Sequence, residues 1–128
     1  MNKKFPIYRD ASQLVIETEI AVKQFSRYHK YTLGSEMRVT AYNILEHISL
    51  AINQPKSLSS DKKELIIKAH RDTEKFKIKI QIARSLNIFP NFKRFEILAK
   101  TVISVSKQCF AWQQKIVTPQ YTPTGDKM

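Results

Sequence analysis

The sequence predicts an all-α protein, an up-down-up-down four-helix bundle followed by a disordered C-terminal tail. Four long segments repeat apolar residues at steps of three and four, which is the spacing of one helix face. Short turn-forming stretches join these segments, so successive helices should lie antiparallel. The 128 residues include only 2 glycines, too few for the many turns of a β-sandwich or barrel. We expect the bundle to span residues 1–117 and the tail to span residues 118–128.

The first two helices are expected over residues 8–26 and 33–53. Their apolar faces comprise Ala11, Leu14, Val15, Thr18, Val22 and Phe25 in the first, and Leu33, Met37, Ala41, Ile44, Ile48 and Ala51 in the second. Thr32 or Ser35 can cap the start of the second helix, because either side chain can accept a backbone hydrogen bond there. Pro55 ends that helix, since proline cannot continue it.

The third helix is expected to begin after Asp61 and to continue to Leu86. Asp61 and Glu64 have the spacing of a capping box. The apolar face comprises Ile66, Ala69, Thr73, Phe76, Ile80 and Ala83. Over residues 76–82 apolar and polar residues alternate, which is also a strand pattern. Residues 62–86 contain no turn signal and follow strong helix formers, so helix is the better prediction.

The fourth helix follows a turn at residues 87–91 and has the clearest heptad repeat. Its core positions are Phe95, Leu98, Val102, Val105, Cys109, Trp112 and Ile116. Because Cys109 occupies one of them, a buried inert thiol is a better interpretation than a nucleophile. As the only cysteine, it also excludes an intrachain disulfide and a cysteine zinc site.

Positive charge is concentrated in the second half of the chain. The formal net charge is +11, and residues 62–115 contain 13 basic and 4 acidic residues. At about 100° per residue, two rows of cations lie opposite the core face of their helix. The Lys68 row comprises Lys68, Arg71, Lys75 and Lys79, and the Lys93 row comprises Lys93, Lys100 and Lys107. Such rows can follow a phosphate backbone, although a merely solvated lysine surface is the alternative.

Two further groups of residues are candidates for binding. The outer apolar residues project away from the core faces of the third and fourth helices and are Ile67, Ile78, Ile82, Ile103 and Phe110. A small monomer rarely exposes so many, so we expect a homo-oligomer or an obligate partner, with a wide core as the alternative. In the loop of residues 27–31, Arg27 and Lys30 alternate with aromatic rings, which suits unpaired bases and phosphates. Alternatively, Tyr28 and Tyr31 close the end of the bundle.

The sequence contains no signature of catalysis, of a metal site or of a cofactor. His29, His47 and His70 lack the spacing of metal ligands, and no HExxH, GxSxG or glycine-rich phosphate loop is present. We therefore expect a protein that is not an enzyme and needs no cofactor. No stretch approaches the roughly 18 apolar residues of a membrane span, and no signal-peptide pattern opens the chain, so we expect a cytoplasmic protein without a membrane partner.

Several short motifs resemble one known family, and they are spread over nearly the whole chain. They are Pro6-Ile7-Tyr8, Tyr31-Thr32-Leu33-Gly34 with Arg38 after it, Ala41-Tyr42-Asn43-Ile44-Leu45-Glu46, and Trp112. This set is similar to the accessory variability determinant proteins of diversity-generating retroelements. The chain departs from that family at Phe25-Ser26, where Phe-Pro is common, and at Cys109-Phe110-Ala111, where small residues commonly precede the tryptophan. Residues 43–51 lack the Ser-Ile-Pro-x-Asn-Ile-Ala-Glu-Gly run of the related bundles encoded in ribosomal RNA intervening sequences.

The resemblance implies a small basic four-helix bundle that assembles as a ring-shaped homopentamer. It also implies binding to a reverse transcriptase and to its template RNA or cDNA, in support of mutagenic cDNA synthesis and without polymerase activity. The leading hypothesis is therefore a non-catalytic accessory subunit that binds RNA, DNA or both. The alternative is a structural or protein-interaction bundle of the intervening-sequence type that has no direct role with nucleic acid.

Overall fold

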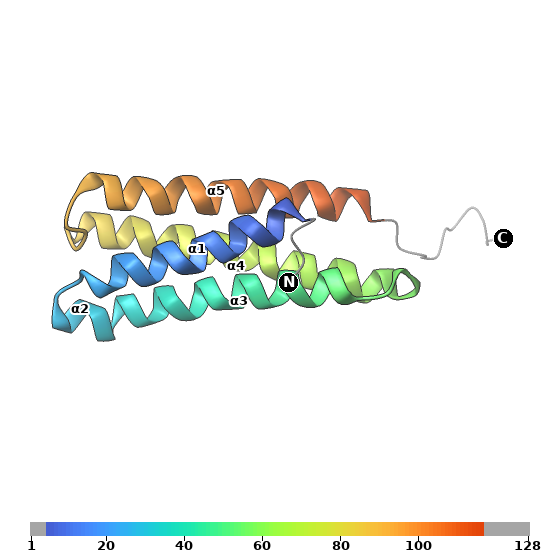
Figure 1. The fold of residues 1–128 in the computed structure, drawn as a ribbon, viewed down its shortest axis with the longest axis horizontal. Coiled ribbons are helices and arrows are strands. Elements are labelled where there is room, and N and C mark those ends of the chain that lie inside the picture. The colour runs from blue at the N-terminus through green and yellow to red at the C-terminus, as the bar shows by residue number, and fades with distance from the viewer. Residues whose placement is uncertain (1–4, 117–128) are drawn as a thin grey trace.

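The structure is a computed structural model, and it describes residues 5–116 apart from the Lys56 side chain, so the expected tail lies outside the described residues. This part of the chain is helical and contains no strand (Figure 1). Its elements are α1 (Pro6–Lys23), α2 (Arg27–Tyr31), α3 (Leu33–Asn53), the 3-10 turn η1 (Lys56–Leu58), α4 (Ser59–Ser85) and α5 (Phe92–Lys115). The four long helices are compatible with the expected four-helix bundle.

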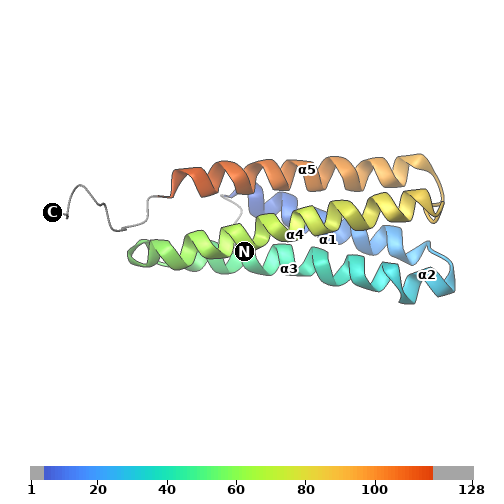
Figure 2. The same ribbon diagram turned by 180° about the vertical axis from the view of Figure 1, so that it is seen from behind.

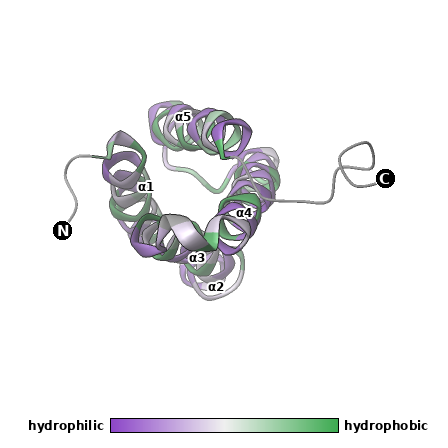
Figure 3. Ribbon diagram, turned by 90° about the vertical axis from the view of Figure 1, so that its right-hand side faces the viewer, coloured by the Kyte–Doolittle hydropathy of each residue, from purple (hydrophilic) through white to green (hydrophobic). Residues whose placement is uncertain are grey.

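The long helices lie side by side around a common centre. Helix α3 packs against α1 and α4, and α5 packs against the same two helices from the other side. The view along their length shows this closed arrangement (Figure 3). Opposite views place α2 and the α4–α5 loop at the same end of the molecule (Figures 1 and 2). No helix within residues 5–116 is long and apolar enough to cross a membrane.

Most of the core consists of residues that helical spacing predicted, and Ile7, Ala21, Ile88 and Phe89 add to it. Every residue named for the first and third apolar faces is buried. So are the second-face residues except Leu33, and the fourth-face residues except Trp112 and Ile116. Leu33, Trp112 and Ile116 are half-buried and pack against this core. Because buried apolar area is the main stabilising term in folding, these four faces hold the bundle together.

The ambiguous segment at residues 76–82 is helix, as predicted. Phe76 and Ile80 are buried in the core, whereas Ile78 and Ile82 are 64% and 48% exposed. A strand would place all four side chains on one face. A helix separates them, because positions 76 and 80 share a face and position 78 points about 200° away.

The predicted helix caps are wrong in their details. Helix α4 begins at Ser59, so Asp61 lies inside the first turn and the N-cap position belongs to Leu58. Thr32 does occupy the N-cap position of α3, but its side chain makes no capping hydrogen bond. The Thr32 hydroxyl instead donates to the carbonyl oxygen of Tyr28 at 2.8 Å. It therefore joins α3 to the short helix that precedes it.

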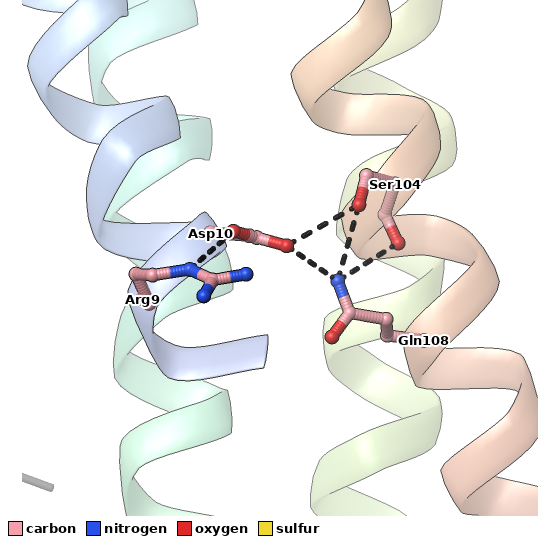
Figure 4. A network of polar contacts seen from close by, with 4 residues as sticks. All are labelled: Arg9, Asp10, Ser104 and Gln108. Carbon is pink, nitrogen blue, oxygen red and sulfur yellow. Dashed lines mark hydrogen bonds and ion pairs between the residues drawn. The ribbon is translucent and has the colours of Figure 1, made fainter. Parts of the chain in front are cut away.

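Polar contacts fix the neighbouring helices against one another. The Arg94 guanidinium on α5 donates to Glu17 on α1 at 2.8 Å. The Asp10 carboxylate of α1 accepts hydrogen bonds from Gln108 at 2.8 Å and from Ser104 at 3.3 Å, both on α5 (Figure 4). Burial alone would raise the Asp10 pKa, but the hydrogen bonds from Arg9 and Gln108 outweigh it and hold this pKa below its usual value.

Candidate nucleic-acid interface

The outward face of α4 carries three cations without a carboxylate partner. Lys68, Arg71 and Lys75 are exposed, and none of them forms an ion pair within the described residues. Lys79 differs from the expectation for the Lys68 row. Its ammonium group lies 3.2 Å from Glu36 of α3, and its side chain is only 24% exposed. The free part of the row is therefore Lys68, Arg71 and Lys75.

Asp72 lies within this stretch of sequence but does not neutralise it. Its side chain points into the α3–α4 contact, where Oδ2 lies 3.0 Å from Nδ1 of His47. The residue is buried, because one step along a helix turns a side chain by about 100°. Its negative charge is therefore directed toward α3 and away from the outward cations.

The outward face of α5 has lysines that share an acid. Glu96 forms ion pairs with both of its neighbours: one carboxylate oxygen lies 3.6 Å from the Lys93 ammonium group and the other lies 3.7 Å from that of Lys100. Both lysines are 74% exposed, so these contacts are of the weak surface kind. Lys107 is exposed and has no ion pair in the part of the chain that the structure describes. The Lys93 row therefore presents one free lysine and two shared ones.

Four of the five outer apolar residues are exposed, and Ile67 is half-buried. Ile78 and Ile82 share the outward face of α4 with Arg71 and Lys75, all within about 60° of rotation. Ile103 and Phe110 lie on the edge of α5 that is nearer α4, where the Phe110 ring is 6.1 Å from the ring of His70. The apolar and basic residues are thus mixed on α4 and better separated on α5.

A small polar cluster holds α4 to α5 between these two faces. The Glu74 carboxylate accepts a hydrogen bond from Lys77 at 2.8 Å and another from Ser106 at 3.2 Å. The hydrogen bond from Lys77 lowers the Glu74 pKa, and partial burial opposes this shift without cancelling it. Lys77 is therefore engaged within the protein and is not one of the cations available to a ligand.

Residues 27–31, expected as a loop, form the short helix α2. Tyr28 and Tyr31 are both 71% exposed, so the interpretation that they close the end of the bundle is wrong. Rings of Phe25, Phe89 and Phe95 close it instead, with centroid distances of 5.5 Å and 5.8 Å between successive pairs. On α2, Arg27 is exposed and Lys30 is half-buried.

The described residues offer no metal-binding group of three or more His, Cys, Asp or Glu side chains. Cys109 is fully buried, and burial raises the pKa of its thiol to about 12. A thiol with so high a pKa carries almost no thiolate at neutral pH, so it is a poor nucleophile. Cys109 acts as a core side chain.

Two cations near α2 were not predicted from the sequence as part of a binding surface. Lys23 ends α1 and is exposed, and Arg38 lies on the second turn of α3. Arg38 donates to Glu19 at 2.8 Å. A basic residue in the last turn of the first helix, just before an aromatic run, was the available signal for Lys23.

No family model matches this chain, and no curated protein matches it.

Proposed function

We propose that this chain is a non-catalytic protein that binds nucleic acid through its outward α4 face. One observation carries the proposal, namely the exposed cations Lys68, Arg71 and Lys75 that lack a carboxylate partner in the described chain. Lysines and arginines that face a phosphate backbone release its counterions, which supplies most of the affinity of sequence-independent binding. The net charge of +11 strengthens the attraction at long range.

The motif resemblance extends the proposal to a biological role. We infer an accessory subunit of a diversity-generating retroelement that acts in the cytoplasm beside a reverse transcriptase, on template RNA or on cDNA. In this role the protein supports mutagenic cDNA synthesis without being a polymerase. Arg27 and Lys30 on α2, together with Lys107 on α5, would add to the phosphate-binding surface.

We also infer that the helices connect in up-down-up-down order, which leaves the charged faces of α4 and α5 adjacent. Contacts between helix starts and helix ends support this order. Glu36 near the start of α3 pairs with Lys79 near the end of α4. Asp10 near the start of α1 meets Gln108 near the end of α5. Such pairs are expected where two neighbouring helices run in opposite directions.

Self-association, as a homopentamer or another ring, is the second part of the proposal. The exposed residues Ile103 and Phe110 support it, because they lie beside the α4–α5 contact and apart from the free cations of the Lys68 row. An interface there would leave the phosphate-binding side chains open. A ring would then repeat them, so that one long nucleic acid meets many copies at once.

A second candidate function is a bundle that binds only proteins. The observation that favours it is the mixing of Ile78 and Ile82 with cations on the outward face of α4. An acidic amphipathic helix could cover both kinds of side chain. Such a partner would compete directly with nucleic acid for this surface.

Salt dependence of RNA binding tests the proposed function. The logarithm of the affinity of the full chain for a single-stranded RNA should fall linearly with the logarithm of the salt concentration. Each phosphate contact should contribute roughly 0.7 to this slope. The triple variant Lys68→Glu, Arg71→Glu, Lys75→Glu should reduce that slope by the contribution of about three phosphate contacts. Helical content should stay unchanged, since exposed substitutions cost about 0.5 kcal/mol or less each.

A matched triple variant distinguishes the contribution of this surface to RNA binding from the contribution of total charge. Lys62, Lys63 and Lys115 lie near the other helix ends, and their reversal changes the net charge by the same amount. We expect a smaller loss of affinity from that variant. Equal losses would mean that the α4 face has no special role, and an unchanged slope in the first variant would refute phosphate binding there.

A further inference from the structure

A pocket of about 430 Å³ lies where the end of α1, the short helix α2 and the first turns of α3 meet. Helix α2, which contributes two of its lining residues, lies at the end of the molecule that also carries the α4–α5 loop (Figures 1 and 2). Its lining residues are Glu19, Ile20, Val22, Lys23, Lys30, Tyr31, Ser35 and Arg38. This size falls in the range of small-ligand pockets, which is roughly 300–1,000 Å³.

One wall of the pocket is apolar and aromatic. Ile20 is 39% exposed and Tyr31 is 71% exposed, so both present apolar surface to water. Tyr31 lies on a five-residue helix and makes no ring contact with another side chain in the described structure. A planar ligand could cover this phenol ring without displacing a packed neighbour.

The lining also carries three cations, Lys23, Lys30 and Arg38, against one acid. Lys23 and Lys30 have no ion pair among the residues the structure describes. The only carboxylate in the lining belongs to Glu19, whose Oε1 accepts Arg38 Nε at 2.8 Å. This hydrogen bond lowers the Glu19 pKa against a smaller effect of burial. The pocket therefore has two ammonium groups without an ion pair in the described chain beside an exposed aromatic ring.

Gly34 determines how closely α2 approaches α1 and α3, and thus the shape of the pocket. A Cβ atom at this position would lie 2.8 Å from the carbonyl oxygen of His29 and 2.8 Å from Cγ1 of Val22. The Val22 side chain could turn aside, but the His29 backbone could move only if α2 itself shifted. Glycine at position 34 therefore allows α2, which supplies Lys30 and Tyr31 to the pocket lining, to pack closely against α1 and α3.

We propose that this pocket binds a single unpaired nucleotide, with the base against Tyr31 and Ile20 and the phosphate between Lys23 and Lys30. The proposal rests on the nucleic-acid-binding function above and adds to it the part of the strand that is recognised. Stacking of a base on an aromatic side chain is tolerant of sequence and needs a base that is not already stacked in a duplex. The free α4 cations, in contrast, suit any phosphate backbone.

A short single-stranded RNA, a duplex of the same length and uridine monophosphate form the three arms of the test. The variant Tyr31→Ala should weaken binding of the single strand about tenfold, which is the usual effect of one lost base stack. Duplex affinity should stay within about twofold, since no base can leave the helix to stack. Tyr31→Phe should restore single-strand binding, because the ring is retained.

Tyr28→Ala provides the matched control. Tyr28 lies on the same short helix and is also 71% exposed, but it does not line the pocket. We expect it to change all three affinities by less than about twofold. Gly34→Ala keeps both tyrosines but should distort the pocket, so it should also weaken single-strand binding more than duplex binding. If Gly34→Ala does not fold, the Tyr31→Ala result alone decides.

The outcomes separate the pocket from the proposed function. If the unaltered chain binds RNA but Tyr31→Ala and Tyr28→Ala behave alike, the pocket proposal is overturned while phosphate binding by α4 remains. If the chain binds neither RNA, both proposals fail. Binding of uridine monophosphate that depends on Tyr31, with single-strand affinity unaffected, would assign the pocket to a free nucleotide and overturn recognition within a strand.

Discussion

The outward faces of α4 and α5 carry cations at similar helical spacing, yet the two faces are electrostatically different. On α4, Lys68, Arg71 and Lys75 form no ion pair in the described chain, although Glu64 lies four residues before Lys68 on the same face. On α5, Glu96 lies between Lys93 and Lys100 and contacts both. The availability of a cation to a phosphate therefore depends on the direction of the nearest acid, and total charge does not report it.

The direction of the nearest acid follows from helix geometry on both faces. Glu96 is three residues after Lys93 and four before Lys100, so all three side chains lie on one side of α5. Asp72 is next to Arg71 in sequence, but the helix turns it toward His47 on α3. On α5 the acid three or four residues away pairs with the lysines, whereas on α4 the acid adjacent to Arg71 turns away from it.

The largest effect we predict concerns the boundary between the two faces. Phe110→Asp should disrupt self-association, because burial of one phenylalanine stabilises an interface by about 1.5–3 kcal/mol and a buried carboxylate would cost more. The side chain is 51% exposed in the single chain, so folding should be nearly unaffected. Light scattering over a range of concentrations would measure the change, and a monomer already present in the unaltered protein would refute this interface.

The next prediction compares the two faces directly. Lys75→Glu should weaken RNA binding by about tenfold near 0.1 M salt, whereas Lys100→Glu should weaken it by only about threefold. Both substitutions change the charge by the same amount at exposed helix positions, so stability should change by about 0.5 kcal/mol or less. Fluorescence anisotropy at two salt concentrations gives both affinities. Equal effects would mean that pairing with Glu96 is irrelevant.

Most of the fold follows from the sequence because each helix is dominated by one buried face. The spacing of Ile66, Phe76 and Ile80 identifies their common face without any knowledge of the partner helix. Helix ends are harder to predict. The short helix α2 depends on the close approach at Gly34, which no local pattern reveals, and α4 begins at Ser59, before the Asp61 that the capping-box spacing favoured.

The candidate site was less predictable than the fold. Spacing within one helix correctly placed Lys68, Arg71 and Lys75 on an exposed face. The partner of Lys79, however, is Glu36, which is 43 residues away in sequence. The pocket at α2 similarly combines side chains from three helices. Such groupings depend on the packing of helices and cannot be read from the period of any one of them.

A smaller effect concerns the contact between α1 and α5, which holds α5 in place and so fixes the orientation of its outward face. Asp10→Asn should lower the free energy of unfolding by about 1 kcal/mol at neutral pH, since the charged acceptor for Gln108 and Ser104 is lost. Folding lowers the Asp10 pKa from its ordinary value of 3.8. Its contribution is therefore complete above that value and is lost as pH falls through the lower folded pKa.

Denaturant unfolding of the two proteins at several pH values would measure this contribution. The difference between them should shrink below about pH 4. A difference that stays constant from neutral to strongly acidic pH would indicate that the charge of Asp10 is not what holds α5 against α1.

The smallest effect we predict comes from a substitution that frees the α5 lysines from their acid, as the α4 cations already are. Glu96→Gln releases Lys93 and Lys100 from their shared carboxylate, so RNA affinity should rise by about threefold, a modest gain because exposed ion pairs are weak. Glu46→Gln is the matched control, since Glu46 is an exposed acid of α3, away from both basic rows and without an ion pair in the described chain, and its loss changes the net charge equally. A larger gain from Glu96→Gln would show that freeing particular lysines matters more than charge alone. Equal gains would reduce the difference between the two faces to a difference in net charge.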